Sequence, residues 1–188
     1  FLIIFTDDQG WADLGSYGSL KHKTPRMDQL AAEGTRFTSF YAQPTFGPSR
    51  SALTTGRYPI RSKGGEMPAS EITFAELLQG VGYQTVAIGK WDLSDREASP
   101  LLMPNSQGFD YYYGPLGSNT PGRVAFFENN VFVSSTTDMA SLTRLYTDKA
   151  IDYLENRRDK NRPFVLYLSH SMMHTVIEIG RASCRERV

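Results

Sequence analysis

"FLIIFTDDQG" (Phe1–Gly10) begins with a continuous apolar run and passes directly into a polar loop that carries Asp7 and Asp8. A short apolar run that ends in such a loop is typical of a buried strand in a parallel sheet. The same pattern recurs over Tyr83–Ile88 and Phe164–Leu168. We therefore predict that these three segments are neighbouring buried strands of one sheet.

Helical patterns alternate with these strands. Thr24 suits an N-cap before Pro25, and Gly34 suits a helix terminator. A second capped helix is expected from Thr73 to Gly80 or Gly82, and an amphipathic helix over roughly Met139–Arg158. This alternation predicts an α/β fold with a mostly parallel central sheet that is covered on both faces.

Three weaker strands are also predicted. The aromatic residues of Phe37–Tyr41 suggest a strand, and two short strands are expected near Phe109–Tyr113 and Val124–Phe127 within a loop-rich region.

The composition is that of a globular chain. It has 188 residues, of which 40% are hydrophobic and 21% charged, enough for one domain with a core. Twenty basic and twenty acidic residues cancel, so no net charge attracts nucleic acid or a membrane surface. No apolar run reaches the roughly 18 residues of a membrane span.

The last residues differ from the rest. "EIGRASCRERV" (Glu178–Val188) is identified as the translation of a common sequencing adapter, and it contains Cys184, the only cysteine. We expect residues 1–177 to be a partial domain truncated at both ends, and residues 178–188 to be a non-native tail without a packed role. The compartment of the protein is left open, because the chain begins inside a predicted strand.

Polar residues follow each of the main predicted strands. Asp7 and Asp8 follow the first strand, Lys90 follows the second, and His170 and His174 follow the last. Open α/β sheets bind ligands at the carboxyl ends of their strands. These residues therefore point to a single site.

The residue types suit a doubly or singly charged tetrahedral anion. Paired carboxylates at Asp7 and Asp8 suit Ca²⁺ or Mg²⁺, although a solvated turn is the simpler alternative. Arg50, one turn into a helix that starts near Pro48, is placed to meet an anion at that helix's N-terminus, or lies on the surface. Lys90 offers a positive charge for an oxyanion, and His174 a proton for a leaving oxygen, unless it is a structural residue. Phosphate and sulfate esters both fit.

Five stretches, taken in order, resemble one family. They are "TDDQGWADLGSYG" (Thr6–Gly18), "TPRMDQLAAEGTRFTSFYAQ" (Thr24–Gln43), "GPSRSALTTGRYP" (Gly47–Pro59), "AIGKWDLS" (Ala87–Ser94) and "PFVLYLSHSMMHT" (Pro163–Thr175). Together they resemble the N-terminal part of the sulfatase family (arylsulfatase-like) of the alkaline-phosphatase superfamily. The resemblance implies a three-layer α/β/α sandwich and hydrolysis of sulfate esters with a bound Ca²⁺, or Mg²⁺ in some members. It also implies a formylglycine nucleophile, made from Cys or sometimes Ser by a formylglycine-generating enzyme.

The resemblance assigns roles to individual residues. Asp7 and Asp8 would be metal ligands, and Arg50 would hold the formylglycine. Lys90 would bind the sulfate oxygens, with His174 as acid or sulfate ligand at the ester oxygen. Ser118, in "GPLGSN", is similar to a serine that contacts sulfate in the family. The implied substrate is a sulfated small molecule or glycan.

Two positions depart from the family pattern. Phe46 stands where the modifiable cysteine belongs, and Asp92 stands where the family has histidine. Phe46 offers no sulfur or hydroxyl to oxidise, and a carboxylate near a sulfate costs on the order of a kcal/mol or more. Each exchange corresponds to a single-base change, so a sequence error and genuine inactivation both account for them.

Three functions therefore remain open. The first is a sulfuric ester hydrolase whose present copy is inactive because of Phe46. The second is a non-catalytic, degenerate sulfatase that binds metal or a sulfated ligand. The third, ranked last, is a phosphate ester hydrolase, because that chemistry normally places Thr or Ser where Phe46 stands.

Overall fold

The computed structural model describes residues 1–62, 67–93 and 100–174. The chain divides into two compact units. One unit joins Phe1–Asp7 to the chain from Gln43 onward, and the other is Asp8–Ala42. The expected tail, Glu178–Val188, lies outside the described residues, as does Cys184.

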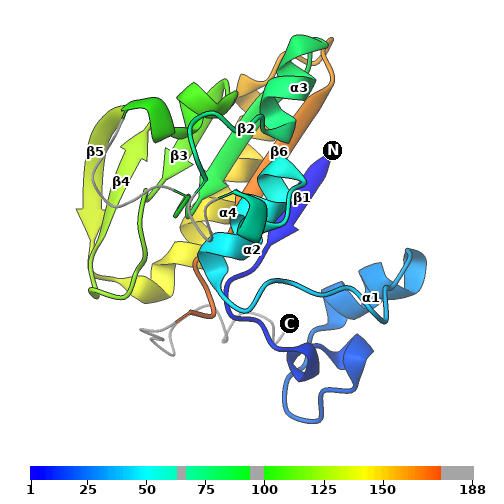
Figure 1. Cartoon of the computed structure of the whole chain (residues 1–188). Coiled ribbons are helices and arrows are strands. Elements are labelled where there is room, and N and C mark those ends of the chain that lie inside the picture. The colour runs from blue at the N-terminus through cyan, green and yellow to red at the C-terminus, as the bar shows by residue number, and fades with distance from the viewer. Residues whose placement is uncertain (63–66, 94–99, 175–188) are drawn as a thin grey trace. The chain divides into compact units, whose positions relative to one another are not determined.

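The larger unit is built on a six-stranded mixed sheet, in which the strands follow the order β1-β6-β2-β3-β4-β5 (Figure 1). The strands are β1 (Leu2–Phe5), β2 (Gln84–Gly89), β3 (Tyr111–Gly114), β4 (Val124–Glu128), β5 (Val131–Thr136) and β6 (Phe164–Ser169). The first four strands in this order run parallel, whereas β4 and β5 are antiparallel. The three main predicted strands are therefore neighbours in a mostly parallel sheet, as expected.

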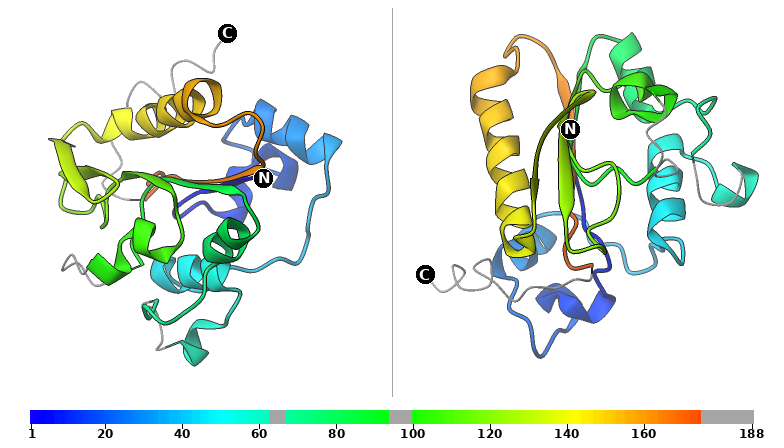
Figure 2. Two further views of the ribbon diagram at one scale, coloured as in Figure 1. Left: turned by 90° about the horizontal axis from the view of Figure 1, so that it is seen from above. Right: turned by 90° about the vertical axis from the view of Figure 1, so that its left-hand side faces the viewer.

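Helices cover both faces of this sheet. The α4 helix (Leu142–Asp152) lies on one face, and α2 (Phe46–Thr55) and α3 (Phe74–Gly80) lie on the other (Figure 2). This arrangement confirms the predicted α/β/α layering.

Side-chain alternation along the strands supplies the two cores. Val86 and Ile88 of β2 pack in the cluster that contains α4, whereas Ala87 between them packs in the cluster on the α2 and α3 side. Successive strand side chains point to opposite faces, so each central strand contributes to both layers.

The helix boundaries follow local signals. Thr73 caps α3, because its hydroxyl accepts from the Glu76 backbone N–H while the Glu76 carboxylate accepts from the Thr73 backbone N–H. The helix expected over Met139–Arg158 is present as a 3₁₀ turn (Met139–Ser141), α4 and a π-helical turn (Tyr153–Arg157). Further 3₁₀ turns are Pro59–Arg61, Pro100–Leu102 and Pro104–Gln107.

The prediction that β1 is buried is wrong. Leu2 and Ile4 are 52% and 53% exposed. These residues face the same side of the sheet as their β6 partners Leu166 and Leu168. The α4 helix packs on β2 and β6, so its cover ends before the outermost described strand is reached.

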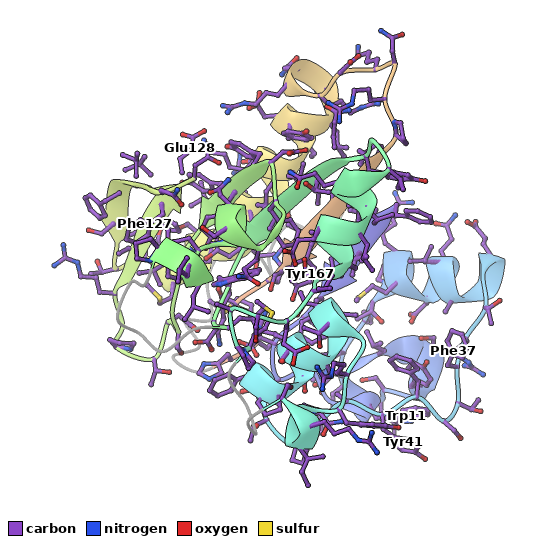
Figure 3. All side chains as sticks on the ribbon, turned by 45° about the horizontal axis from the view of Figure 1, so that its top comes forward. Trp11, Phe37, Tyr41, Phe127, Glu128 and Tyr167 are labelled. Carbon is purple, nitrogen blue, oxygen red and sulfur yellow. The ribbon has the colours of Figure 1, made fainter. Side chains whose placement is uncertain are left out.

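Two further strand predictions need correction. Phe37–Tyr41 does not form a strand, and Phe37, Phe40 and Tyr41 are 63%, 76% and 84% exposed (Figure 3, with Phe37 and Tyr41 labelled). The Phe37 carbonyl accepts from the Tyr17 hydroxyl instead of from a neighbouring strand. Conversely, β5 was not predicted, although it pairs with β4 in an antiparallel hairpin.

The smaller unit contains two 3₁₀ turns, Trp11–Asp13 and Gly15–Tyr17, and helix α1 (Pro25–Glu33). The α1 helix begins after Thr24, as expected, but the Thr24 hydroxyl makes no capping bond to the helix. It donates to the Asp28 carboxylate, which also accepts from the Ser16 backbone N–H. Asp28 therefore ties the start of α1 to the preceding turn.

Candidate functional site

The end of β2 places Lys90 at the carboxyl edge of the sheet. Gly89 has a positive φ of 103°, and a Cβ there would lie 1.9 Å from the Ser169 carbonyl oxygen at the end of β6. Only glycine permits this conformation and this close approach together. The Lys90 backbone N–H then donates to the same Ser169 carbonyl (2.8 Å). The absence of a side chain at Gly89 and the hydrogen bond from the Lys90 backbone N–H to the Ser169 carbonyl thus bring the ends of β2 and β6 together.

The Lys90 side chain is the centre of a charged cluster. Its ammonium Nζ lies 2.7 Å from Asp7 Oδ2 and 3.2 Å from Asp92 Oδ2. The same Nζ lies 4.5 Å from the centroid of the Phe46 ring, over the ring face. Lys90 is only 1% exposed. Residues from β1, β2 and the start of α2 therefore meet at one buried ammonium.

Arg50 is held beneath this cluster. Its Nη1 donates to the Ser169 hydroxyl and to the Lys90 carbonyl (3.2 Å), and its Nη2 lies 3.5 Å from Asp7 Oδ1. Its guanidinium carbon also lies 5.1 Å from the Phe5 ring centroid. Arg50 is fully buried, and its charge is directed at the sheet and at Asp7.

Phe46 and His174 form the outer part of the site. Their rings meet edge to face with centroids 5.9 Å apart. The His174 carbonyl accepts from the Asn119 side-chain amide (3.3 Å). Phe46 is 36% exposed, whereas Asp7, Lys90 and His174 are all buried. Phe46 is therefore the partly exposed member that covers the charged residues.

Asp92 adopts an unusual backbone conformation, with a positive φ of 49°. Its backbone N–H donates to the Leu116 carbonyl (2.9 Å), which holds the turn. Asp, Asn and His are the residues most enriched in this region of φ. The backbone at this position therefore accepts either Asp or the family's His.

Two of the residues predicted for the site lie elsewhere in the description of the chain. Asp8 is exposed and belongs to the smaller unit. Ser118 pairs with the Thr120 hydroxyl (2.6 Å) within its own loop, one residue before Asn119. The cluster in the larger unit thus consists of Asp7, Phe46, Arg50, Lys90, Asp92 and His174.

Three supporting residues were missed in the sequence analysis. Ser169 accepts from Arg50, Asn119 donates to the His174 carbonyl, and Phe5 lies against the Arg50 guanidinium. Ser169 ends a predicted strand, so the rule that led to Lys90 also leads to it. Asn119 lies in an irregular loop, where no local pattern indicates a partner.

His170 is a buried neutral residue beside the site. Its backbone N–H donates to the Phe5 carbonyl (2.8 Å), and its ring lies 6.1 Å from the Tyr146 ring. Nδ1 has no hydrogen-bond partner among the residues that the structure describes. Burial lowers the pKa of His170 to about 4 from its ordinary value of 6.5. His170 is therefore uncharged at neutral pH.

This lowered pKa predicts a pH-dependent stability. The unfolded chain takes up a proton on His170 near pH 6.5, and the folded chain only near pH 4. The contribution is fully present above pH 6.5 and is lost as the pH falls toward 4, by about 3 kcal/mol over the whole window. His170→Gln should remove this part of the slope. Urea unfolding of both proteins across this pH range measures it, and identical slopes would contradict the assignment.

The cluster balances its charges internally. Two carboxylates, Asp7 and Asp92, face two cations, Arg50 and Lys90. The four charges cancel, and the Lys90 ammonium, which could otherwise meet an anion, is already in contact with two carboxylates. No group of three or more metal-ligating side chains gathers anywhere in the described ranges. In those ranges, too, no helix is long and apolar enough to cross a membrane.

Sequence comparisons find one family. The Sulfatase family model matches residues 1–181. Arylsulfatase G of Canis lupus familiaris is 34% identical over 220 residues, which cover 94% of this chain and 41% of that protein. N-acetylgalactosamine-6-sulfatase of Sus scrofa is 34% identical over 215 residues, covering 96% of this chain and 41% of that protein. The chain thus spans about two fifths of the length of these relatives.

Solved structures agree with the sequence matches. A protein in complex with its substrate D-glucosamine-2-N,6-O-disulfate aligns with a TM-score of 0.78 and 32% identity, covering 93% of this chain and 34% of that chain. A second, in complex with k-i-k-neocarrahexaose, aligns with a TM-score of 0.81 and 31% identity, covering 97% of this chain and 46% of that chain.

Proposed function

The chain belongs to the sulfatase family, and on that premise we propose that it is part of a sulfuric ester hydrolase with its site at the carboxyl edge of β1, β6 and β2. The observation that carries the proposal is the convergence of Asp7, Arg50 and Lys90 with the Phe46 position. These residues come from three separate family motifs. Their contacts support one anion site rather than three unrelated surface features.

Within this site we assign roles to the chain's own residues. In a copy with the family's residues at positions 46 and 92, Lys90 would bind the sulfate oxygens. His174 would protonate or contact the ester oxygen beside position 46, where the rings of Phe46 and His174 meet in this chain. Arg50 stabilises the negative charge of the Asp7 carboxylate, because its Nη2 lies 3.5 Å from Asp7 Oδ1. Ser118 is a further sulfate contact, supported by its position next to Asn119, which contacts the His174 carbonyl.

The proposed substrate class is a sulfated sugar, alone or in a glycan. Two observations support this class: one curated relative is an N-acetylgalactosamine-6-sulfatase, and one structural neighbour binds D-glucosamine-2-N,6-O-disulfate as its substrate. The chain spans 41% of the length of this curated relative and of arylsulfatase G.

This copy is proposed to be inactive. The formylglycine that a formylglycine-generating enzyme makes in the family does not fit position 46, because a phenyl ring carries no sulfur or hydroxyl. Asp92 adds a second obstacle, since its carboxylate lies 3.2 Å from the ammonium that would bind sulfate. Phe46 therefore has no atom that could attack a sulfate ester.

The divalent cation is also a proposal. In a copy with the family's residues at positions 46 and 92, Asp7 and Asp8 would be ligands of Ca²⁺, or alternatively Mg²⁺, because such ions prefer carboxylate oxygens. The residues of this chain do not fit the ion well. Both oxygens of Asp7 already face cations, Oδ2 toward Lys90 and Oδ1 toward Arg50.

A non-catalytic, sulfatase-like protein is the second candidate. Phe46 favours it, because its ring covers Lys90 where an anion would approach. A phosphate ester hydrolase stays the third candidate, without a nucleophilic residue at position 46 to support it.

The test restores the family's residues at positions 46 and 92 and compares hydrolysis of sulfate esters with hydrolysis of phosphate esters. Phe46→Cys with Asp92→His, made in the full-length protein and produced with a formylglycine-generating enzyme, should hydrolyse a chromogenic aryl sulfate. Mass spectrometry confirms the aldehyde at position 46. A variant that carries the aldehyde yet hydrolyses a phosphate diester and no sulfate ester would show that the sulfatase proposal is wrong.

A further inference from the structure

The Lys90 ammonium is enclosed by groups of the protein. Three groups among the described residues surround it, and of these the Asp7 carboxylate alone accepts a hydrogen bond from it. They are Asp7 Oδ2 at 2.7 Å, Asp92 Oδ2 at 3.2 Å and the face of the Phe46 ring at 4.5 Å. We propose that Lys90 is the resident cation of this site, held by Asp7, Asp92 and Phe46 in place of a divalent metal ion. This inference rests on the proposed function, which assigns a metal ion to Asp7.

Burial makes the Lys90 ammonium depend on these protein groups for its solvation. Lys90 is 1% exposed and Asp7 is 2% exposed, so water contributes little to their solvation. A buried charge is tolerated only where it is paired and hydrogen-bonded. Aromatic faces attract ammonium groups most strongly when these are desolvated. Each of the three partners therefore replaces a part of the water that Lys90 has lost.

The two departures from the family pattern, Phe46 and Asp92, act together around Lys90. We call the three groups that enclose its ammonium (Asp7, Asp92 and Phe46) the Lys90 cage. Phe46 and Asp92 supply two of the three contacts of Lys90. With the family's Cys and His at these positions, the ammonium would keep Asp7 as its carboxylate partner but lose the Asp92 carboxylate and the ring. Asp92 and Phe46 are therefore a matched pair rather than two independent losses of function.

These contacts of Lys90 disfavour both the metal ion and the sulfate that the family resemblance implies for this site. A divalent cation at Asp7 would lie beside both the Lys90 ammonium and the Arg50 guanidinium. An anion at Lys90 would have to displace the Phe46 ring and lie against the Asp92 carboxylate. We therefore expect the chain to be stable without metal and to bind neither Ca²⁺ nor inorganic sulfate.

The first measurement tests the cage directly in the full chain. In ¹⁵N-labelled protein, the Lys90 ammonium should give an NMR signal that exchanges slowly with water and is shifted upfield by the Phe46 ring. Phe46→Leu should remove the upfield shift, and Asp92→Asn should speed exchange while preserving the backbone conformation at position 92. A Lys90 ammonium that exchanges as fast as surface lysines, in the unsubstituted chain, would overturn the proposal.

The second measurement tests the exchange of cations. Thermal unfolding of the unsubstituted chain should not change with millimolar Ca²⁺. Lys90→Met releases Asp7 and Asp92, so we expect Ca²⁺ to raise its Tm by about 3–6 °C, as for roughly tenfold excess of ligand over Kd. Lys149→Met is the matched control, because Lys149 also lies over a ring, that of Tyr113 at 4.4 Å.

The outcomes are separable from those of the activity test. A Ca²⁺-dependent rise in the unsubstituted chain, or no rise in a folded Lys90→Met variant, contradicts the resident-cation proposal and leaves the sulfatase assignment intact. If Lys90→Met does not fold, the NMR comparison of Phe46→Leu and Asp92→Asn decides. Failure of the restored enzyme to hydrolyse sulfate esters would instead contradict the proposed function.

Discussion

No sulfate ester hydrolysis is expected from the chain as it stands, even with Ca²⁺ and a formylglycine-generating enzyme present. Phe46→Cys in the full-length protein should allow formation of the aldehyde but give only weak turnover, because Asp92 still lies 3.2 Å from Lys90. Adding Asp92→His should raise the rate by a further factor of roughly 10² to 10⁴, the range for one positioned acid or anion-stabilising group. Initial rates with an aryl sulfate measure each step.

Asp92→His alone is the matched control for this series. It restores the histidine but leaves Phe46, so it should remain inactive. Equal rates for Phe46→Cys and the double variant would show that Asp92 does not impede the site. Activity in the Asp92→His variant would show that position 46 is not the nucleophile.

The second large effect concerns Arg50. Arg50→Met should lower the free energy of unfolding by about 3–5 kcal/mol, because removal of one partner leaves buried charge uncompensated. The variant loses the bonds of Arg50 to Ser169 and to the Lys90 carbonyl, as well as its ion pair with Asp7. Urea unfolding at neutral pH measures the change.

Arg57→Met is the matched control for Arg50. Arg57 also pairs with a carboxylate, that of Glu71 at 2.7 Å, but its side chain is 51% exposed. Exposed ion pairs contribute at most about 1 kcal/mol. Similar decreases in the free energy of unfolding for the two variants would mean that burial of Arg50 does not increase its contribution to stability.

Much of the fold was predictable because its signals are local. The apolar segment of β2 and the Thr73–Glu76 capping box lie within a few residues of the structures they specify. The β1 faces and Phe37–Tyr41 were mispredicted for the opposite reason. A strand is buried or paired only if another element covers it, and an apolar segment does not show whether that element is present.

Some residues of the candidate site could be predicted from local sequence signals, and others could not. Residues at strand ends, such as Asp7 and Lys90, were found because carboxyl ends of parallel strands meet at one edge. Asp8 follows the same strand end as Asp7, whereas Ser118 came from the resemblance alone, and the roles of both residues are still proposals. Asn119 had no signal, because its contact with His174 spans 55 positions of chain.

The resemblance of five stretches indicated the family, which the family model confirms, and local patterns predicted that the three main strands are neighbours in one sheet. Periodicity, caps and residue identity can all be read without knowing where a side chain points. Folding alone settled that Arg50 turns to Ser169 and Asp7, and that Lys90 is enclosed by Asp7, Asp92 and Phe46. The physical reason is separation along the chain: Arg50 and Ser169 are 119 positions apart, and Lys90 and Asp7 are 83 apart. Which distant groups share a buried space depends on how the layers pack.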